Sequence, residues 1–455
     1  MIYEISMFEL AKNLKSEYDI ELNGSNTITK LAVFVSSLCE GISNIKNISK
    51  HKDVGNIIEI LNSFAIRVVQ DKNLIIVDGR DISEWQQPNN VVNIHSSLDV
   101  LKYLVSIVSF RNFRVFITGD DDFISNNSIN LEHLENNNFI FRDSGNHLPV
   151  VLLGDYKPSR NTFKIKTTLE KHCVLLNSIV SKKNYFLTEC GIRNEYLENI
   201  LGFYGAEIKE NLFESRMFLV GNVVKCKELS ITNVGKGITA KDFVVPIDIN
   251  EAVYTIFVGL LLDLEKFNIK NVSVNEFNGE ILKMLIENGI DLELKNQRIS
   301  NGLKTVDLVV KKSKLKMLPI SKSKLLKILD LYPFIILLNV IKKNELRILG
   351  LKELKIQEKS NYNFLADFLK SIDVSLEEDG DVLVLNNDNV SYNNIDEIRI
   401  EEYSNIDDKV FLAIYLANII FNKRIRNNGN VVDLTNIFPN IHNLFNQLNI
   451  KVKDD

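Results

Sequence analysis

The sequence predicts a soluble α/β protein of two or three domains, and three observations carry this prediction. The chain has 455 residues, and domains average roughly 150 residues. Its composition, 45% hydrophobic and 25% charged, is that of an ordinary globular protein. One order of elements recurs along the chain about every 70 residues, a spacing too long for a solenoid repeat. The order is an apolar helix, a strand, a shorter helix and one or two strands.

The first recurrence shows how each element is assigned. Apolar residues at helical spacing predict helices at 31–38 and 54–64, and alternating or β-branched stretches predict strands at 41–48, 65–69 and 74–77. The same reasoning predicts later helices at 98–109, 129–135, 165–180, 194–203, 249–263, 279–288, 325–341, 363–371, 412–420 and 441–448. It predicts later strands at 113–118, 139–142, 150–153, 184–188, 206–209, 271–274, 291–294, 345–349, 373–376 and 431–433. The pattern fits compact α/β units stacked into domains, but ordinary α/β alternation gives similar strings.

Charge and hydropathy exclude several classes of protein. Lys and Arg number 54 against 59 Asp and Glu, so the net charge of −5 offers no basic surface for nucleic acid. The longest apolar run, 333–341, is far shorter than the roughly 20 residues that a membrane span needs. Glu4, Glu9 and Lys12 interrupt the N-terminal segment where a signal peptide requires an apolar core. We expect a cytoplasmic protein with no nucleic-acid or membrane partner.

The cysteines and histidines indicate neither a disulfide framework nor a metal site. Cys39, Cys173, Cys190 and Cys226 are widely spaced and include no CxxC pair, so they are expected to be reduced and mostly buried thiols. The six histidines show no HxxxH or HExxH spacing. We therefore expect no metal and no cofactor.

Several motifs, in order along the chain, resemble those of 5-enolpyruvylshikimate-3-phosphate (EPSP) synthases. LNGSNTITKLA at 22–32 is similar to the family's L-P-G-S-K-S-x-S-N-R-A, and EGISNI at 40–45 to E-G-x-S-x-I. Asp53 falls at the family's D-D-V/T pair, and GDD at 119–121 resembles T-G-D-E. PIDINEA at 246–252 is similar to P-G-D-I-S-S-A, LDLYP at 329–333 to I-D-E-I-P, ELKIQE at 353–358 to E-L-R-V-K-E, and FPN at 438–440 to S-F-P-N.

The resemblance implies a fold of two inverse α/β-prism domains built from βαββαβ units, with substrates bound in the cleft between them. It places one domain at 24–243 and the other, discontinuous, at 1–23 plus 244–455. It also implies substrate-binding roles for Ser25, Asn26, Thr27, Glu170 and Lys409. The family's two proton-transfer carboxylates fall at Asp330 and Glu358. Both are expected on loops that face the cleft. The alternative is that neither residue has a functional role. Asp330 is then a turn residue before a proline, and Glu358 is a solvated residue after a strand.

The site departs from the family pattern much more than the fold does. Shikimate 3-phosphate and phosphoenolpyruvate together carry about six negative charges, if each phosphate carries about two, so their site needs Lys and Arg forks. Where the family has cations, this chain has Asn26, Leu31, Gln357, Asn361 and Asn436. Two arginines, expected near 94–100 and 121–128, are also absent, Gln becomes Glu170, and D-H-R becomes Asp407, Asp408 and Lys409.

The free energy lost with these cations argues against the family's reaction taking place in the family's site. Removing one partner of a buried charge pair costs about 3–5 kcal/mol, and the loss of several such cations amounts to on the order of 10 kcal/mol after discounting for non-additivity. We therefore expect a divergent or non-catalytic homologue, with a small anionic metabolite or a protein as its partner.

Two alternatives stay open. One is an enolpyruvyl-transferase-like enzyme acting on a less anionic substrate. The other is an active 3-phosphoshikimate 1-carboxyvinyltransferase whose cations are relocated to Lys30, Lys166, Lys171, Lys355 and Lys409.

Overall fold

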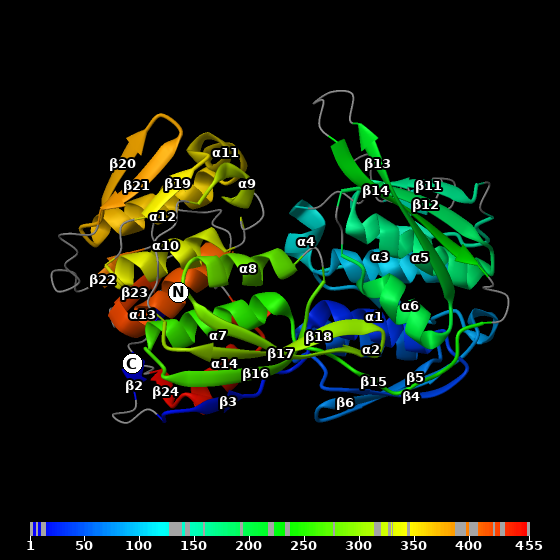
Figure 1. The fold of residues 1–455 in the computed structure, drawn as a ribbon. Helices are drawn as coiled ribbons and strands as arrows, with labels where there is room; N and C mark the ends of the chain where they lie inside the picture. The colour runs from blue at the N-terminus through cyan, green and yellow to red at the C-terminus, as the bar shows by residue number, and fades with distance from the viewer. Residues whose placement is uncertain are drawn as a thin grey trace.

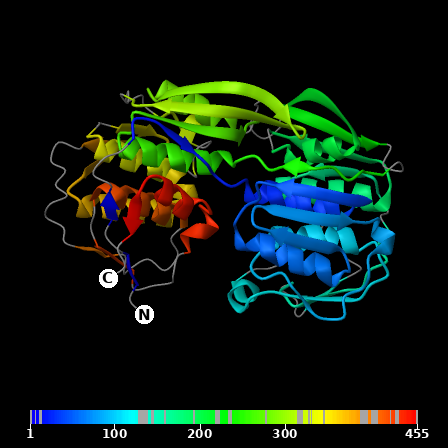
Figure 2. The same cartoon turned by 90° about the horizontal axis from the view of Figure 1, so that it is seen from below.

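The protein consists of two lobes, in each of which helices lie inside and sheets lie outside (Figure 1). The computed structural model describes residues 3–5, 8–10, 15–126, 139–141, 146–157, 160–191, 194–216, 223–232, 237–275, 278–313, 320–325, 329, 331–343, 346–386, 397–399, 408–421, 424–427 and 433–452. Within them, no helix is long and apolar enough to cross a membrane. Seen from below, one lobe is blue to green, and the other contains the yellow to red part of the chain together with dark blue N-terminal strands and green segments (Figure 2).

The first lobe contains three similar units, each with a four-stranded sheet. The first consists of α1 (Asn26–Ser37), β4 (Gly41–Lys46), α2 (Lys52–Ser63), β5 (Arg67–Asp71) and β6 (Leu74–Gly79), with β15 (Phe243–Val244) at its edge. The second consists of β7 (Val92–Asn93), α3 (Leu98–Val108), β8 (Val115–Thr118), α4 (Asp121–Asn126), β9 (Phe139–Phe141) and β10 (Val150–Leu152). The third consists of β11 (Thr162–Ile165), α5 (Thr168–Ser181), β12 (Tyr185–Cys190), α6 (Tyr196–Tyr204), β13 (Glu207–Arg216) and β14 (Val223–Thr232).

The second lobe repeats this plan less regularly. Its first unit consists of β3 (Tyr18–Ile20), α7 (Ile249–Leu261), β16 (Lys266–Ser273), α8 (Gly279–Glu287), β17 (Asp291–Ser300) and β18 (Leu303–Lys311). The next consists of α9 (Lys322–Leu325), α10 (Tyr332–Ile341), β19 (Leu346–Leu349), α11 (Leu351–Gln357), α12 (Lys359–Ser371), β20 (Ser375–Asp379) and β21 (Val382–Asn386). The last brings together β1 (Tyr3–Ile5), β2 (Phe8–Leu10), β22 (Glu397–Arg399), α13 (Asp408–Phe421), β23 (Arg424–Asn427), α14 (Ile441–Gln447) and β24 (Ile450–Val452).

The two-domain α/β fold class is confirmed, and the order within a unit is corrected. In the third unit, β11 pairs parallel with β12, and β12 and β13 both pair antiparallel with β14. The chain order in this unit is therefore βαβαββ and not the βαββαβ implied by the resemblance. It is the helix–strand–helix–strand–strand order of the hydropathy pattern with one more strand before it. The first helix of a unit is buried on nearly all sides; in α1, all ten residues from Ile28 to Ser37 are buried. Such a helix needs sheets or other helices around it.

Two local predictions differ from the structure, and two others fall wholly or mostly outside the described residues. The helix predicted at 325–341 is not continuous in the described residues, because α10 begins only at Tyr332, with Pro333 in its first turn, where a missing N–H costs nothing. The segment 351–357, expected to be a connector, is the helix α11. The helix predicted at 129–135 and most of the strand predicted at 431–433 lie outside the described residues.

Two of the four cysteines are joined, which corrects the expectation of reduced thiols. Cys190 on β12 and Cys226 on β14 stand opposite each other in the antiparallel ladder, with Cα atoms 4.1 Å apart, and form a disulfide. Because the two cysteines are 36 residues apart, the sequence pattern does not indicate that they are neighbours in the fold. Cys39 and Cys173 are free and buried, as expected, and burial raises the pKa of both thiols to about 12.

The buried apolar residues fall into two cores. One runs from Ile28 to Val245 and also takes in Leu303, and the other combines Tyr18, Ile20 and Leu22 with residues from Ile247 to Ile450. The chain thus passes between the cores twice, once near residues 22–28 and once near 245–247. We propose that the cores correspond to the two domains, 24–243 and 1–23 plus 244–455.

Replacing Gly24 by Ala should destabilise the protein by about 1–3 kcal/mol, because the added methyl group overpacks the first of these passages. Its Cβ would lie 2.3 Å from the Asn47 carbonyl oxygen and 2.5 Å from Val245 Cγ1. Gly55→Ala is the matched control: nothing lies within 4 Å of the new methyl group, and helix propensity favours Ala by up to about 1 kcal/mol. Urea unfolding followed by circular dichroism measures both variants. Equal losses would contradict a close contact at Gly24.

Candidate functional site

The residues predicted to bind substrate begin at the N-terminal end of α1. Ser25 is the N-cap of this helix: its backbone N–H donates to the Pro246 carbonyl at 2.8 Å, and its hydroxyl donates to Asp248 Oδ2 at 3.1 Å. Asn26 and Thr27 form the first turn and are half-buried, and Asn26 Oδ1 is buried without a hydrogen-bond partner. The first motif is therefore where the chain enters the first core, and its serine already has a carboxylate partner.

Glu170 is used for helix capping. It lies in the first turn of α5 and accepts the Lys166 N–H at 2.8 Å, while its own N–H donates to the hydroxyl of the N-cap Thr167 at 3.1 Å. This arrangement is similar to a capping box, except that Glu170 accepts the N–H of the residue before the N-cap, and it satisfies two backbone donors at the helix start. The expected substrate contact of Glu170 stays a prediction, because a capping role explains its position without a ligand.

Of the two predicted catalytic carboxylates, the structure describes only Glu358. Asp330 lies outside the described residues. Glu358 is half-buried at a bend where α11 ends and α12 begins, rather than on a loop after a strand. Its Oε2 accepts Asn361 Nδ2 at 2.5 Å, and its backbone carbonyl accepts the Tyr362 N–H at 2.7 Å. Glu358 thus starts a helix, and whether it faces a substrate stays a prediction. Lys409, half-buried, lies in the first turn of α13 in the same lobe.

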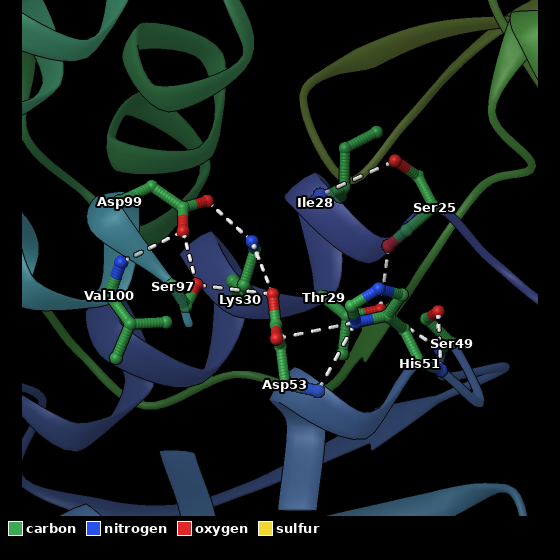
Figure 3. Close-up of polar contacts among 10 residues, drawn as sticks. All are labelled: Ser25, Ile28, Thr29, Lys30, Ser49, His51, Asp53, Ser97, Asp99 and Val100. Carbon is green, nitrogen blue, oxygen red and sulfur yellow. Dashed lines mark hydrogen bonds and ion pairs between the residues drawn. The ribbon is translucent and has the colours of Figure 1, made fainter. Parts of the chain in front are cut away.

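Lys30, one of the proposed relocated cations, lies in a buried charge cluster that sequence reasoning did not assemble (Figure 3). Its side chain is 6% exposed, and its Nζ contacts Asp53 Oδ2 at 3.1 Å and also Asp99 Oδ2. Ser97 Oγ donates to Asp53 at 3.1 Å and to Asp99 at 2.6 Å. One lysine therefore serves two carboxylates, and the cluster has no positive charge to spare for an anionic ligand.

Asp53 connects this cluster to the start of α2. His51 is the N-cap, and its Nδ1 accepts the Asp53 N–H at 3.2 Å. Burial alone would raise the pKa of Asp53, but the contact with the His51 ring and the charge of Lys30 outweigh burial and hold this pKa well below its usual range. Asp53 stood out in the sequence through its motif, yet only the fold brings Ser97 and Asp99, from the start of α3, to its side.

A second lysine is sequestered in the same way. Lys171 on α5 is fully buried, and its Nζ lies 2.6 Å from Glu198 Oε1, 3.2 Å from Glu189 Oε2 and 2.7 Å from the Asn194 carbonyl oxygen. Burial raises the pKa of Glu198, and the charge of Lys171 opposes that rise. Lys355, a third candidate, pairs with Glu378 at 2.5 Å. Three of the five relocated-cation candidates therefore have carboxylate partners within the protein.

The described residues form no metal site, and one cavity lies apart from the candidate residues. In the described ranges, no group of three or more His, Cys, Asp or Glu side chains could hold a metal ion. A cavity of about 730 Å³ lies between α8 and the β17–β18 hairpin, and none of the candidate site residues lines it.

Replacing Lys30 by Met should cost about 3–5 kcal/mol of stability, because it leaves Asp53, whose side chain is 12% exposed, without its lysine. Lys46→Met is the control: its 3.7 Å pair with Asp242 joins side chains that are more than half exposed, and such pairs contribute about 0–1 kcal/mol. Thermal and urea unfolding compare the two variants. A loss under 1 kcal/mol for Lys30→Met would contradict the buried cluster.

Lys30→Met should also raise the pH at which acid unfolds the protein. A carboxyl with a lowered folded-state pKa stabilises the fold above its unfolded pKa of about 4, and this stabilisation disappears as the pH falls through the folded value. Lys30 contributes to the low pKa of Asp53, so its removal moves that loss to higher pH. Circular dichroism between pH 2 and 6 measures the midpoint. An unchanged midpoint would argue against the coupling of Lys30 to Asp53.

Comparisons with known proteins agree on one family. The sequence model for EPSP synthase (3-phosphoshikimate 1-carboxyvinyltransferase) matches residues 11–126 and 163–401. The 3-phosphoshikimate 1-carboxyvinyltransferase of Petrotoga mobilis is 25% identical over 446 residues, which covers 96% of this chain and 98% of that protein. The one from Endomicrobium trichonymphae is 24% identical over 443 residues, covering 94% and 96%.

Solved structures show the same fold. The EPSP synthase of Acinetobacter baumannii superimposes with a TM-score of 0.80 at 17% identity, covering 99% of this chain and 100% of that one. The enolpyruvyl transferase NikO of Streptomyces tendae superimposes with a TM-score of 0.62 at 14% identity, covering 99% and 98%. Because the family model covers well over half of the chain, this protein belongs to the EPSP synthase family.

Proposed function

We propose that this chain is a divergent, non-catalytic member of the EPSP synthase family, without the activity of a 3-phosphoshikimate 1-carboxyvinyltransferase. The observation that carries the proposal is the ion-pair cluster of Lys30 with Asp53 and Asp99. Lys30 is the one cation within the first motif at 22–32, where Asn26 stands in place of the family's lysine and Leu31 in place of its arginine. A lysine already held by two carboxylates does not attract a phosphate.

The same conclusion follows from Ser25 and Asp248. The Ser25 hydroxyl donates to a carboxylate, and burial raises the pKa of Asp248, because no cation pairs with it in the described part of the chain. An anionic ligand brought to the start of α1 would meet this carboxyl and an asparagine instead of a lysine. The remaining partners for this region are a weakly bound small anionic metabolite or another protein.

The alternative is an active 3-phosphoshikimate 1-carboxyvinyltransferase with relocated cations. In its favour, relatives that bear this name align with nearly the whole chain, and Glu358 occupies the position of a family carboxylate. Of the five lysines offered as relocated cations, Lys166 and Lys409 remain to be tested. The alternative therefore requires these two, with groups outside the described residues, to bind both substrates.

Incubating the protein with phosphoenolpyruvate and shikimate 3-phosphate should release no inorganic phosphate above background, because most of the cations expected to bind both substrates are absent or pair with carboxylates. A phosphate-release assay measures this, with the Petrotoga mobilis relative as positive control. Turnover that Glu358→Gln or Asp330→Asn abolishes would overturn the proposal in favour of the alternative. Turnover that both variants retain would overturn it as well and would point to a different catalytic group.

Asn26→Lys should strengthen phosphoenolpyruvate binding by roughly tenfold or more, since a hydrogen bond to a charged group contributes about 1.5–3 kcal/mol. The wild-type protein is expected to bind this ligand with a dissociation constant in the millimolar range or weaker. Isothermal titration calorimetry measures both. Asn26→Gln, which lengthens the side chain without adding charge, is the matched control. Micromolar binding by the wild type in the presence of shikimate 3-phosphate would contradict the proposal.

A further inference from the structure

The cavity between α8 and the β17–β18 hairpin has the dimensions of a small-molecule site. Its volume of about 730 Å³ falls within the range of about 300–1,000 Å³ that is typical of ligand pockets. None of the residues that the family resemblance singles out lines it. It is therefore a separate place in the fold from the candidate site, and we call it the hairpin cavity.

Both walls of the hairpin cavity are held in place by the first lobe. At the start of α8, Asn278 Nδ2 donates to the hydroxyl of Tyr196 on α6 at 3.1 Å. In the other wall, Leu303, the first residue of β18, is 2% exposed and belongs to the core of the first lobe. Because each wall has this second attachment, the cavity is preformed, as small-molecule sites usually are.

The sheet beside the hairpin cavity is irregular on both sides of β18. The pairing of β16 with β18 shifts register between Ile269 and Val272. The pairing of β17 with β18 shifts between Lys295 and Arg298. Each shift marks a β-bulge, and bulges are common next to functional sites, where they redirect a side chain. Arg298, which directly follows the second shift, lines the cavity.

Asp307 on β18 connects the two bulges and fixes Arg298. Its Oδ1 accepts the Asn271 N–H at 2.8 Å and Arg298 Nη1 at 3.1 Å, and its Oδ2 accepts Asn296 Nδ2 at 2.8 Å. Arg298 Nη1 also donates to the Asn296 carbonyl at 2.9 Å. A guanidinium group that is already held in this way loses little further freedom when a ligand binds, so Arg298 is preorganised.

The charged side chains of the lining leave one positive charge in excess. Lys283 pairs with Glu280 at 3.0 Å, and Arg298 pairs with Asp307 at 3.1 Å. Lys304 on β18 also lines the cavity and is exposed, and it has no ion-pair partner in the described part of the chain. The hairpin cavity is therefore complementary to a ligand that carries a single negative charge.

The rest of the argument comes from the apolar part of the lining. Leu282 on α8 and Val306 on β18 are buried, and Leu294 on β17 is half-buried. Ile286 on α8 and Ile299 on β17 are 41% and 73% exposed, and both line the cavity. Exposed apolar side chains that gather in a hollow with a polar rim are typical of a binding site.

We propose that the hairpin cavity binds a small molecule with an apolar body and a single carboxylate. The apolar body lies between Ile286 and Ile299, and the carboxylate lies towards Lys304 and Arg298. A highly charged phosphate ester without an apolar part does not fit, because it brings more negative charge than the lining balances and leaves the apolar walls in contact with water. The site does not depend on whether the protein catalyses a reaction, since it shares no residue with the candidate site.

Binding of 2-naphthoate, with 2-naphthamide as its neutral counterpart, tests the proposal. Isothermal titration calorimetry of the full chain at low ionic strength should give a dissociation constant of about 1 mM or tighter for 2-naphthoate. The carboxylate should bind roughly fivefold more tightly than the amide, because only the carboxylate forms ion pairs with the two cations. An absence of binding, or equal binding of the two compounds, would overturn the proposal.

A pair of isoleucine variants locates the ligand in the hairpin cavity. Ile299→Asp should weaken 2-naphthoate binding by roughly tenfold or more, because a like charge replaces part of the apolar wall. Ile42→Asp, the same change at a side chain that is 62% exposed on β4 of the first lobe, should leave the affinity unchanged. Unweakened binding to Ile299→Asp would contradict the proposed site.

A pair of lysine variants tests the charge. Lys304→Gln should reduce the preference for the carboxylate over the amide from roughly fivefold to roughly twofold or less. Lys164→Gln, the same change at an exposed lysine on β11, should keep the wild-type preference. Where Ile299→Asp folds poorly, judged by circular dichroism, the lysine pair still decides the proposal, and an unchanged preference in Lys304→Gln would overturn it.

A competition experiment separates the hairpin cavity from the candidate site. Phosphoenolpyruvate, an anion without a large apolar body, should not displace 2-naphthoate from the wild-type protein. Displacement at equal affinity for the Ile299→Asp variant would place 2-naphthoate at the candidate site and would overturn the proposal.

Discussion

The structure depends on the two backbone segments, near residues 24–25 and 245–246, that pass between its cores. Gly24 N–H donates to the Asn47 carbonyl at 3.0 Å, Ser25 N–H to the Pro246 carbonyl at 2.8 Å and Val245 N–H to the Lys46 carbonyl at 2.9 Å. These bonds hold the starts of α1 and α7 next to each other. Because the N-caps of both helices are at this point, any change here acts on both cores. The absence of a Cβ at position 24 is what allows the backbones to approach.

Among the described residues of the first lobe, each buried lysine pairs with two carboxylates. Lys30 does so with Asp53 and Asp99, and Lys171 with Glu189 and Glu198. Such clusters are costly to break, because removing the lysine leaves an unpaired buried charge. The chain shares its fold with a solved structure to which it is 17% identical, so this fold tolerates extensive change in side chains.

The fold tolerates changes in the polar groups at helix starts because packing depends on other atoms. Packing depends on the apolar faces of helices such as α1 and α7, whose buried residues interdigitate regardless of which polar group occupies the helix start. Helix starts need only a capping acceptor, and Ser25, Thr167 and Asp248 each supply one. Polar groups at helix starts can therefore bond to each other, as Ser25 does to Asp248, without disturbing the packing of the helices.

The sequence by itself determined the fold class, most helix positions and the family, because these depend on periodic apolar residues and on motifs that are local in the chain. The helix at 249–263, for example, needs only its own spacing and the N-cap at Asp248, and the structure ends it within two residues of the prediction. It also places Asn26 and Leu31 where the resemblance leads us to expect cations. Tertiary structure alone decided which charges meet. Asp53 and Asp99 are 46 residues apart, and Asn440 is 417 residues from Asn23, so no local pattern relates them. The same holds for Cys190 and Cys226, which become neighbours only because β12 and β14 pair antiparallel. Contacts of this kind depend on strand register and on the crossing of the chain, which are settled by burying both cores at once.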